Sequence, residues 1–144
     1  SFTGAGRRME KIKETENQVV YRDFAHSPSK LKATTEAIKE TYNGPLLAVF
    51  ELHTFSSLNR DFLPLYKGGM AAADKAIVFY NDAVFEHKKM QFVEPSYVAE
   101  CFENVEIVHS PEILAALVNA AYQKGDNILL MSSGKFEEAK FEFN

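Results

Sequence analysis

The clearest structural signal in this chain is Val19-Val20-Tyr21-Arg22-Asp23-Phe24-Ala25-His26-Ser27-Pro28. Its first part is rich in β-branched and aromatic residues, as strands are, and Ser27 followed by Pro28 is typical of the start of a helix. Asp23 and His26 lie between the two, beside a helix N-terminus whose free N–H groups favour an anion. Because ligands bind at the carboxyl ends of strands in open α/β sheets, this junction is a candidate binding site.

Strand and helix patterns alternate on both sides of this segment. The apolar run 46–52, interrupted only by Glu51, is typical of a strand buried on both faces of a parallel sheet. A weakly alternating strand over 8–14 is expected to form a hairpin with 19–24. We predict further strands at 76–80, 105–108 and 128–131, and helices at 28–42, 60–66, 94–102 and 110–124. The alternation predicts an α/β, Rossmann-like fold: a mostly parallel sheet of about six strands, helices on both faces and an N-terminal antiparallel hairpin.

Composition limits the class of protein. A chain of 144 residues, 46% of them hydrophobic, is typical of one globular domain with its own core. The formal net charge is −4 and no long Lys/Arg block occurs, which argues against nucleic-acid or membrane-surface binding. Cys101 is the single cysteine and is expected to be a buried thiol, as in a reducing, cytoplasmic compartment. No signal peptide or apolar run of about 20 residues is visible. The chain starts at Ser1, so we expect a piece of a larger protein.

Three polar groups are predicted at strand ends. They are Asp23 with His26, the loop 53–59, and Ser132-Ser133-Gly134. Since parallel strands end at one edge of a sheet, we expect these groups to converge there. The alternatives are a turn at Asp23, an ordinary solvated loop at 53–59 and a plain turn at 132–134. His87 and His109 are expected at the surface, apart from these groups.

Several common motifs are missing from the sequence. The cysteine and histidines do not have metal-ligand spacing, so no metal site is predicted. Neither a G-x-x-x-x-G-K-[ST] phosphate loop nor a G-x-G-x-x-G fingerprint occurs. The sequence therefore gives no phosphate-loop signal for the segment at 23–28.

Four motifs identify a resemblance. They are Phe2 to Glu10 (F-x-G-x-x-R-R-x-E), Asp23 to Pro28 (D-[YF]-[AG]-H-x-P), Glu51 to Ser56 (near P-H-x-Y-[ST]) and Met131 to Phe136 (M-S-[NS]-G-x-F). In this order and at these distances they resemble the C-terminal domain of the Mur ligases, the ATP-dependent amide-forming enzymes of peptidoglycan synthesis. The resemblance implies that 1–144 is the third domain of a three-domain ligase joining UDP-N-acetylmuramate to L-alanine. Without the upstream domains, which hold the phosphate loop and Mg²⁺, it implies an inactive fragment with no catalytic residue of its own.

The resemblance also implies residue roles. Asp23, His26 and Ser27 would bind ATP. The amino-substrate pocket would be lined by Phe24, His53, Thr54, Phe55, Ser57, Asn59 and Arg60.

Two departures from the family pattern bear on the substrate. The L-alanine ligases usually have two arginines after the histidine, suited to binding a carboxylate. Here Ser57 and Asn59 stand at those positions, and Arg60 is shifted by one. Glu137 and Glu138 replace a usual Gly-Gly. The incoming amine is therefore L-alanine or a preformed peptide, as in a tripeptide-recycling muramyl ligase. A non-catalytic α/β binding module is the remaining alternative.

Overall fold

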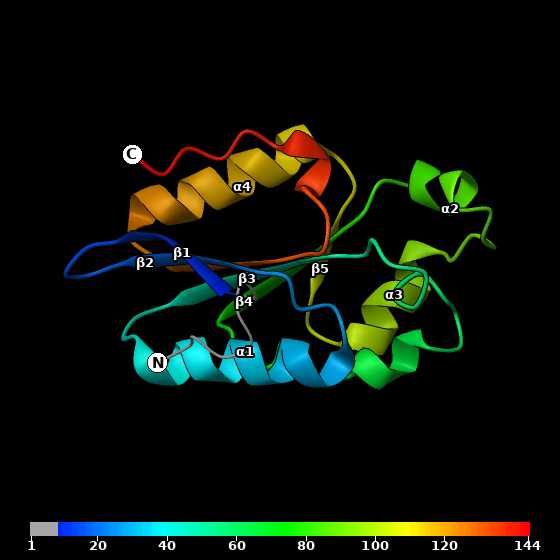
Figure 1. The fold of residues 1–144 in the computed structure, drawn as a ribbon, viewed down its shortest axis with the longest axis horizontal. Helices are drawn as coiled ribbons and strands as arrows, with labels where there is room; N and C mark the ends of the chain where they lie inside the picture. The colour runs from blue at the N-terminus through cyan, green and yellow to red at the C-terminus, as the bar shows by residue number, and fades with distance from the viewer. Residues whose placement is uncertain (1–8) are drawn as a thin grey trace.

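The computed structural model describes residues 9–144, so the motif that begins at Phe2 lies almost wholly outside the described residues. The chain forms one six-stranded sheet (Figure 1). Its strands are β1 (Met9–Glu14), β2 (Val19–Asp23), β3 (Leu46–Glu51), β4 (Lys75–Phe79), β5 (Glu106–Val108) and β6 (Asn127–Met131). Their order is β1-β2-β6-β3-β4-β5, and every pair is parallel except the β1–β2 hairpin. The predicted sheet and hairpin are confirmed.

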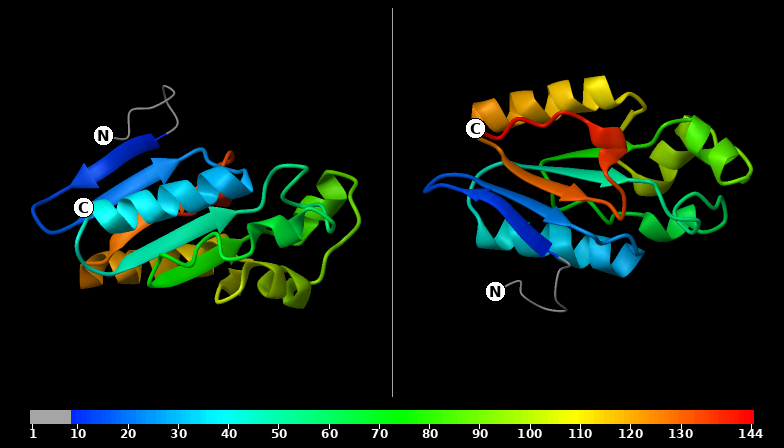
Figure 2. Two further views of the ribbon diagram at one scale, coloured as in Figure 1. Left: turned by 90° about the horizontal axis from the view of Figure 1, so that it is seen from below. Right: turned by 45° about the horizontal axis from the view of Figure 1, so that its top comes forward.

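Helices cover both faces of the sheet. The α-helices are α1 (Pro28–Thr41), α2 (Ala83–His87), α3 (Pro95–Phe102) and α4 (Pro111–Lys124), and the 3-10 helices are η2 (Leu63–Tyr66) and η3 (Phe136–Glu138). Figures 1 and 2 show α1 on one face and α4 on the other, with α3 and η2 on the α1 side. Two details differ from the prediction. The helix expected over 60–66 is only the short η2, and α2 was not predicted.

Strand β3 lies at the centre because its side chains are buried on both faces. Ala48 and Phe50 belong to the apolar cluster on the α1 side, whereas Leu47 and Val49 belong to the cluster on the α4 side. This alternation has the period of two that a pleated strand requires. All of its residues are buried, including Glu51, as the continuous apolar run predicted.

The start of α1 follows from its capping residues. The Ser27 hydroxyl accepts a hydrogen bond from the Lys30 N–H at 3.4 Å, and Pro28 occupies the first turn, where its missing N–H has no cost. The helix then buries Leu31, Thr35 and Ile38 against the sheet. The cap fixes the direction in which the chain leaves β2 and thereby the position of the junction at 23–27.

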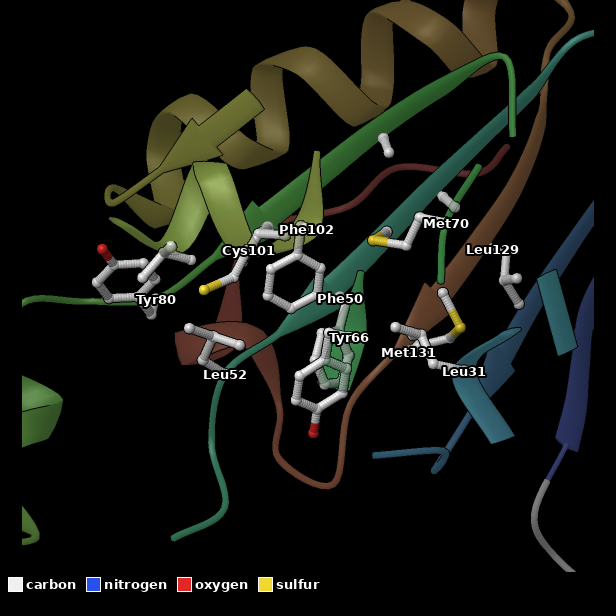
Figure 3. Packing of buried hydrophobic residues seen from close by; sticks show 14 of the residues in the cluster. Leu31, Phe50, Leu52, Tyr66, Met70, Tyr80, Cys101, Phe102, Leu129 and Met131 are labelled. Carbon is white, nitrogen blue, oxygen red and sulfur yellow. The ribbon is translucent and has the colours of Figure 1, made fainter. Parts of the chain in front are cut away.

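An aromatic cluster connects the core to this junction (Figure 3). The Tyr66 ring stacks on Phe102 with centroids 5.0 Å apart and contacts Phe50 at 5.3 Å. The Tyr66 hydroxyl donates a hydrogen bond to the His26 carbonyl oxygen. Burial raises the pKa of the Tyr66 hydroxyl above its usual value. Cys101 is buried in the same cluster, as predicted, and burial raises the pKa of its thiol.

The C-terminal segment, residues 139–144, packs along α4 and is the red trace in Figure 1. The Phe143 ring lies 5.1 Å from that of Tyr122, and Phe141 stacks on Phe143 at 5.9 Å. Asn119 binds the backbone of this segment twice: its Nδ2 donates to the Lys140 carbonyl oxygen at 3.1 Å, and its Oδ1 accepts from the N–H of residue 142 at 2.8 Å. The segment thus covers apolar surface of α4.

Candidate functional site

The ends of three neighbouring strands meet at one edge of the sheet. Strand β6 lies between β2 and β3, so Asp23, Glu51 and Met131 end side by side. The Ser132 N–H donates to the Asp23 carbonyl oxygen at 2.9 Å. The Ser132 hydroxyl donates to Glu51 Oε1 at 2.6 Å. The predicted convergence of the strand ends is confirmed at β2, β3 and β6.

Glu51 organises the loop that follows β6. Its side chain is buried, with 4% of the residue exposed. Oε1 accepts the hydroxyl of Ser132 and also the backbone N–H of Phe136 at 2.9 Å. Ser132 Oγ in turn accepts the Gly134 N–H at 2.7 Å. A buried carboxylate is expensive unless its oxygens are hydrogen-bonded. Glu51 is therefore a positioning residue, which in the sequence was visible only as the one charge in an apolar run.

His53 packs against Gly134. A Cβ atom placed on Gly134 would lie 3.0 Å from Cγ, Cδ2 and Cε1 of the His53 ring. The imidazole therefore lies across the glycine α-carbon, and no larger residue fits there without a shift of the ring. This contact brings together two motifs that are distant in the sequence, Glu51 to Ser56 and Met131 to Phe136.

Ser57 shapes the loop after β3 from inside. It is fully buried, and its hydroxyl accepts the N–H groups of both His53 and Thr54 at 3.1 Å. The same hydroxyl donates to the Thr54 carbonyl oxygen at 3.1 Å. The backbone of the loop is fixed in this way, and its Phe55 side chain is left 63% exposed. Within the described structure Ser57 contributes to the site by holding His53 in place.

Asn59 and Arg60 have other partners. Asn59 Oδ1 accepts the N–H of Asp61 at 2.8 Å and so starts the turn that leads into η2. Arg60 donates to Glu94 Oε1 at 2.7 Å, and its guanidinium lies 4.1 Å from the centroid of the Tyr97 ring. Both contacts direct Arg60 towards the start of α3. The substrate-binding roles expected for these two residues stay predictions.

The predicted nucleotide residues differ in exposure. Asp23 is 4% exposed, and its Oδ2 accepts the Thr34 hydroxyl at 2.8 Å. His26 is exposed, with Nδ1 3.2 Å from the Phe24 carbonyl oxygen. Ser27 caps α1. A ligand at this edge would therefore meet His26 first, while Asp23 lies beneath the surface and faces α1.

Two pockets flank the loop after β6. The larger, of about 660 Å³, is lined by Arg22, Phe24 and Gly134 among others. The smaller, of about 270 Å³, is lined by His53, Asn81, Ala83, Val84, His87, Lys88 and Glu137. Phe24 and His53, expected in one amino-substrate pocket, thus line two neighbouring pockets. His87 is exposed, as expected, yet it lines the pocket of His53; the sequence offered no signal for this, because α2 was not predicted.

The turn η3 at the smaller pocket has an unusual backbone. Phe136, Glu137 and Glu138 have φ angles of 55°, 54° and 58°, in the left-handed region. Non-glycine residues in this region cost about 1–3 kcal/mol each. The Gly-Gly usual in the family would adopt it without strain, so this chain places two glutamates where the backbone favours glycine.

Within residues 9–144 no group of three or more His, Cys, Asp or Glu residues could hold a metal ion. None of the helices in that part of the chain has the length and apolarity needed to cross a bilayer. His109 lies partly exposed at the surface, as expected: its Nδ1 is 3.1 Å from the Tyr80 carbonyl oxygen and from Asp82 Oδ1, and its ring meets that of Tyr80 edge to face at 4.8 Å.

The chain thus has an α/β fold with polar side chains at the ends of its parallel strands, and comparison with known proteins identifies its family. The chain belongs to the family described as "Mur ligase, glutamate ligase domain", whose model matches residues 7–134. It is 33% identical over 138 residues to a UDP-N-acetylmuramate–L-alanine ligase of Caldicellulosiruptor bescii, covering 92% of this chain and 30% of that protein. A ligase of the same name from Pelotomaculum thermopropionicum is 30% identical over 148 residues, covering 98% and 31%.

A solved structure has the same fold. A murein peptide ligase from Psychrobacter arcticus superimposes with a TM-score of 0.69 at 21% identity, covering 94% of this chain and 29% of that one. At this identity the likeness concerns the fold alone. The chain spans about a third of the length of the curated relatives it matches. Membership in the Mur ligase family and the mostly parallel α/β architecture are thus shown.

Proposed function

We propose that this chain is the C-terminal domain of an ATP-dependent ligase that joins UDP-N-acetylmuramate to L-alanine. The observation that supports this best is the packing of His53 on Gly134, which assembles two ligase motifs at the ends of β3 and β6. The names of the relatives point to the same reaction. Because the chain spans about a third of those relatives, the activity is proposed for a whole enzyme and not for this domain alone.

The proposed reaction proceeds in two steps. ATP phosphorylates the muramate carboxylate, and the incoming amine then attacks the acyl phosphate and expels inorganic phosphate. Mg²⁺ and the phosphate loop would be supplied by a central domain, so this chain would bind the nucleoside end of ATP and the amine. Such an enzyme would act in the cytoplasm with its upstream domains as its partners.

On the nucleotide side, His26 is placed to contact ATP directly, because its ring is exposed at the strand edge. Ser27 would contribute through the N-terminus of α1, where N–H groups and the helix dipole favour negative charge. Asp23 lies beneath them with its carboxylate bonded to Thr34. We propose that it contributes to ATP use from that position.

The experiment measures ADP release by HPLC with the full-length protein encoded by the reading frame that contains this chain. UDP-N-acetylmuramate is the acid, and L-alanine is compared with the L-alanyl tripeptide. The expected result is turnover with L-alanine and none with the 144-residue chain alone. Preferential use of the tripeptide would instead assign a recycling ligase, and no turnover with either amine would refute the ligase.

A matched pair of substitutions tests the nucleotide role. Asp23→Ala is expected to raise the KM for ATP much more than it lowers the melting temperature. Thr34→Val removes the same hydrogen bond but keeps the carboxylate, so it should leave the KM for ATP near wild type. A fall in melting temperature for Asp23→Ala with an unchanged KM for ATP would show that the role of Asp23 is structural.

The alternative of a non-catalytic module is tested by the sequence encoded upstream of this chain. A ligase requires a G-x-x-G-K-[ST] phosphate loop in the same reading frame.

A further inference from the structure

We propose that Lys88 and Glu137 determine specificity for the incoming amine: Lys88 binds the carboxylate and Glu137 the ammonium group of a small α-amino acid in the pocket beside His53. The inference rests on the proposed ligase function and names the residues and the substrate class of its amine site. Neither residue belongs to the four motifs from which the substrate residues were predicted.

The location of the pocket connects it with the proposed reaction. His53, a predicted substrate residue, lines it together with side chains from α2 and η3. The neighbouring Phe55 is also linked to it, since the Lys88 ammonium lies 4.9 Å from the centroid of the Phe55 ring. Of the residues predicted from the loop after β3, His53 therefore lines the pocket and Phe55 contacts Lys88, one of the other lining residues.

The charges of the pocket are opposite and unpaired. In the part of the chain that the structure describes, no ion pair or hydrogen bond involves the Lys88 ammonium or the Glu137 carboxylate. An amino acid presents one carboxylate and one ammonium group and would neutralise both. Lys88 would also supply a positive charge that is missing where Ser57 and Asn59 replace two arginines.

The backbone of η3 is a second, independent observation. Glu137 occupies a left-handed conformation, with φ 54° and ψ 30°, in which glycine would be free of strain. Strained backbone of this kind clusters at ligand sites, where a side chain is required despite its conformational cost. Of the three left-handed residues of η3, Glu137 is the one that lines this pocket, and it carries the single acidic side chain among the lining residues.

The size of the pocket favours a single amino acid over a peptide. Ligand pockets commonly measure about 300–1,000 Å³, and this one measures about 270 Å³. A volume of that size is ample for an amino acid with a methyl side chain, but a tripeptide would have to extend beyond it. The inferred substrate class is therefore a small zwitterionic amino acid.

The test uses the full-length protein, UDP-N-acetylmuramate and saturating ATP, with L-alanine and L-alaninamide as amines. L-Alaninamide keeps the amine but lacks the carboxylate. Lys88→Met is expected to raise the KM for L-alanine about tenfold or more and to leave the KM for L-alaninamide unchanged. Lys88→Arg should restore the wild-type ratio of the two. Lys89→Met, which removes the neighbouring charge outside the pocket, should change neither value.

Glu137→Gln is expected to raise the KM for both amines, since both present an ammonium group, whereas Glu86→Gln on the exposed side of α2 should change neither. The KM for ATP should stay at its wild-type value in every variant. An unchanged ratio of L-alanine to L-alaninamide KM in Lys88→Met, or an unchanged KM in Glu137→Gln, would overturn the inference while leaving the ligase in place. A wild-type enzyme inactive with all amines would refute both, and one that accepts only the tripeptide would refute the substrate class.

Discussion

Gly134→Ala tests the contact on which the site is built. A methyl group at this position would lie 3.0 Å from three ring atoms of His53, closer than nonbonded carbon atoms normally approach. Overpacking of this kind costs about 1–3 kcal/mol. The φ of Gly134 is not in the left-handed region, so alanine should also gain about 0.4–1 kcal/mol from the unfolded state. The 270 Å³ pocket beside the ring allows His53 to move. We therefore expect a net loss of about 1 kcal/mol.

A double-mutant cycle separates the two contributions. In a His53→Ala background the ring is gone, so Gly134→Ala should be neutral or stabilising by about 0.4–1 kcal/mol. The coupling between the two positions is then about 1–2 kcal/mol. Urea unfolding of the four proteins, followed by circular dichroism, measures each free energy of unfolding. Additive effects within about 0.3 kcal/mol would refute the packing of His53 on Gly134 and, with it, the assembly of the two motifs.

Three further predictions concern stability. Ser57→Ala should lower the free energy of unfolding by about 1–3 kcal/mol, because two backbone N–H groups lose a buried acceptor, whereas exposed Ser56→Ala should be nearly neutral in the same urea titration. Glu137→Gly should be more stable than Glu137→Gln by about 1 kcal/mol, since glycine relieves the left-handed strain; equal midpoints would contradict this. The Lys39 ammonium and a backbone N–H lower the pKa of Asp74 below its usual 3.8. The stability that Asp74 adds is therefore present above that value and lost as pH falls through the lowered pKa, so wild type and Asp74→Asn should converge in urea titrations as the pH is brought below 3.8.

The strands and long helices follow from the sequence because burial acts on them along their whole length. Strand β3 is apolar throughout because both faces are covered, and α1 repeats buried residues at three- and four-residue steps from its Ser27 cap. Helix α2 has no such stripe, because it is short and buries only Phe85. The turn η3 could not be predicted, since glutamate gives no local signal for a left-handed backbone.

The candidate site, like the fold, could be predicted from the sequence only in part. That the polar ends of β2, β3 and β6 converge follows from the rules of parallel sheets, and the structure confirms it. Which side chains turn inward depends on tertiary contacts that sequence spacing does not reveal. Ser57 is a buried hydrogen-bond acceptor within its loop and not an exposed polar side chain. Glu51 accepts a hydrogen bond from Ser132 in the loop after β6. Lys88 lies in the pocket at the C-terminal end of α2, a helix that the sequence did not predict.

The packing of residues 139–144 on α4 has a practical consequence for dividing this protein into domains. The family match ends at residue 134, so a boundary placed there by sequence similarity would remove Phe143 from Tyr122 and leave both backbone partners of Asn119 missing. The apolar surface of α4 exposed in this way would promote self-association of the shortened polypeptide. For recombinant work, a shortened polypeptide should therefore retain residues 139–144, and a fusion partner placed after them should be separated from Phe143 by a flexible spacer.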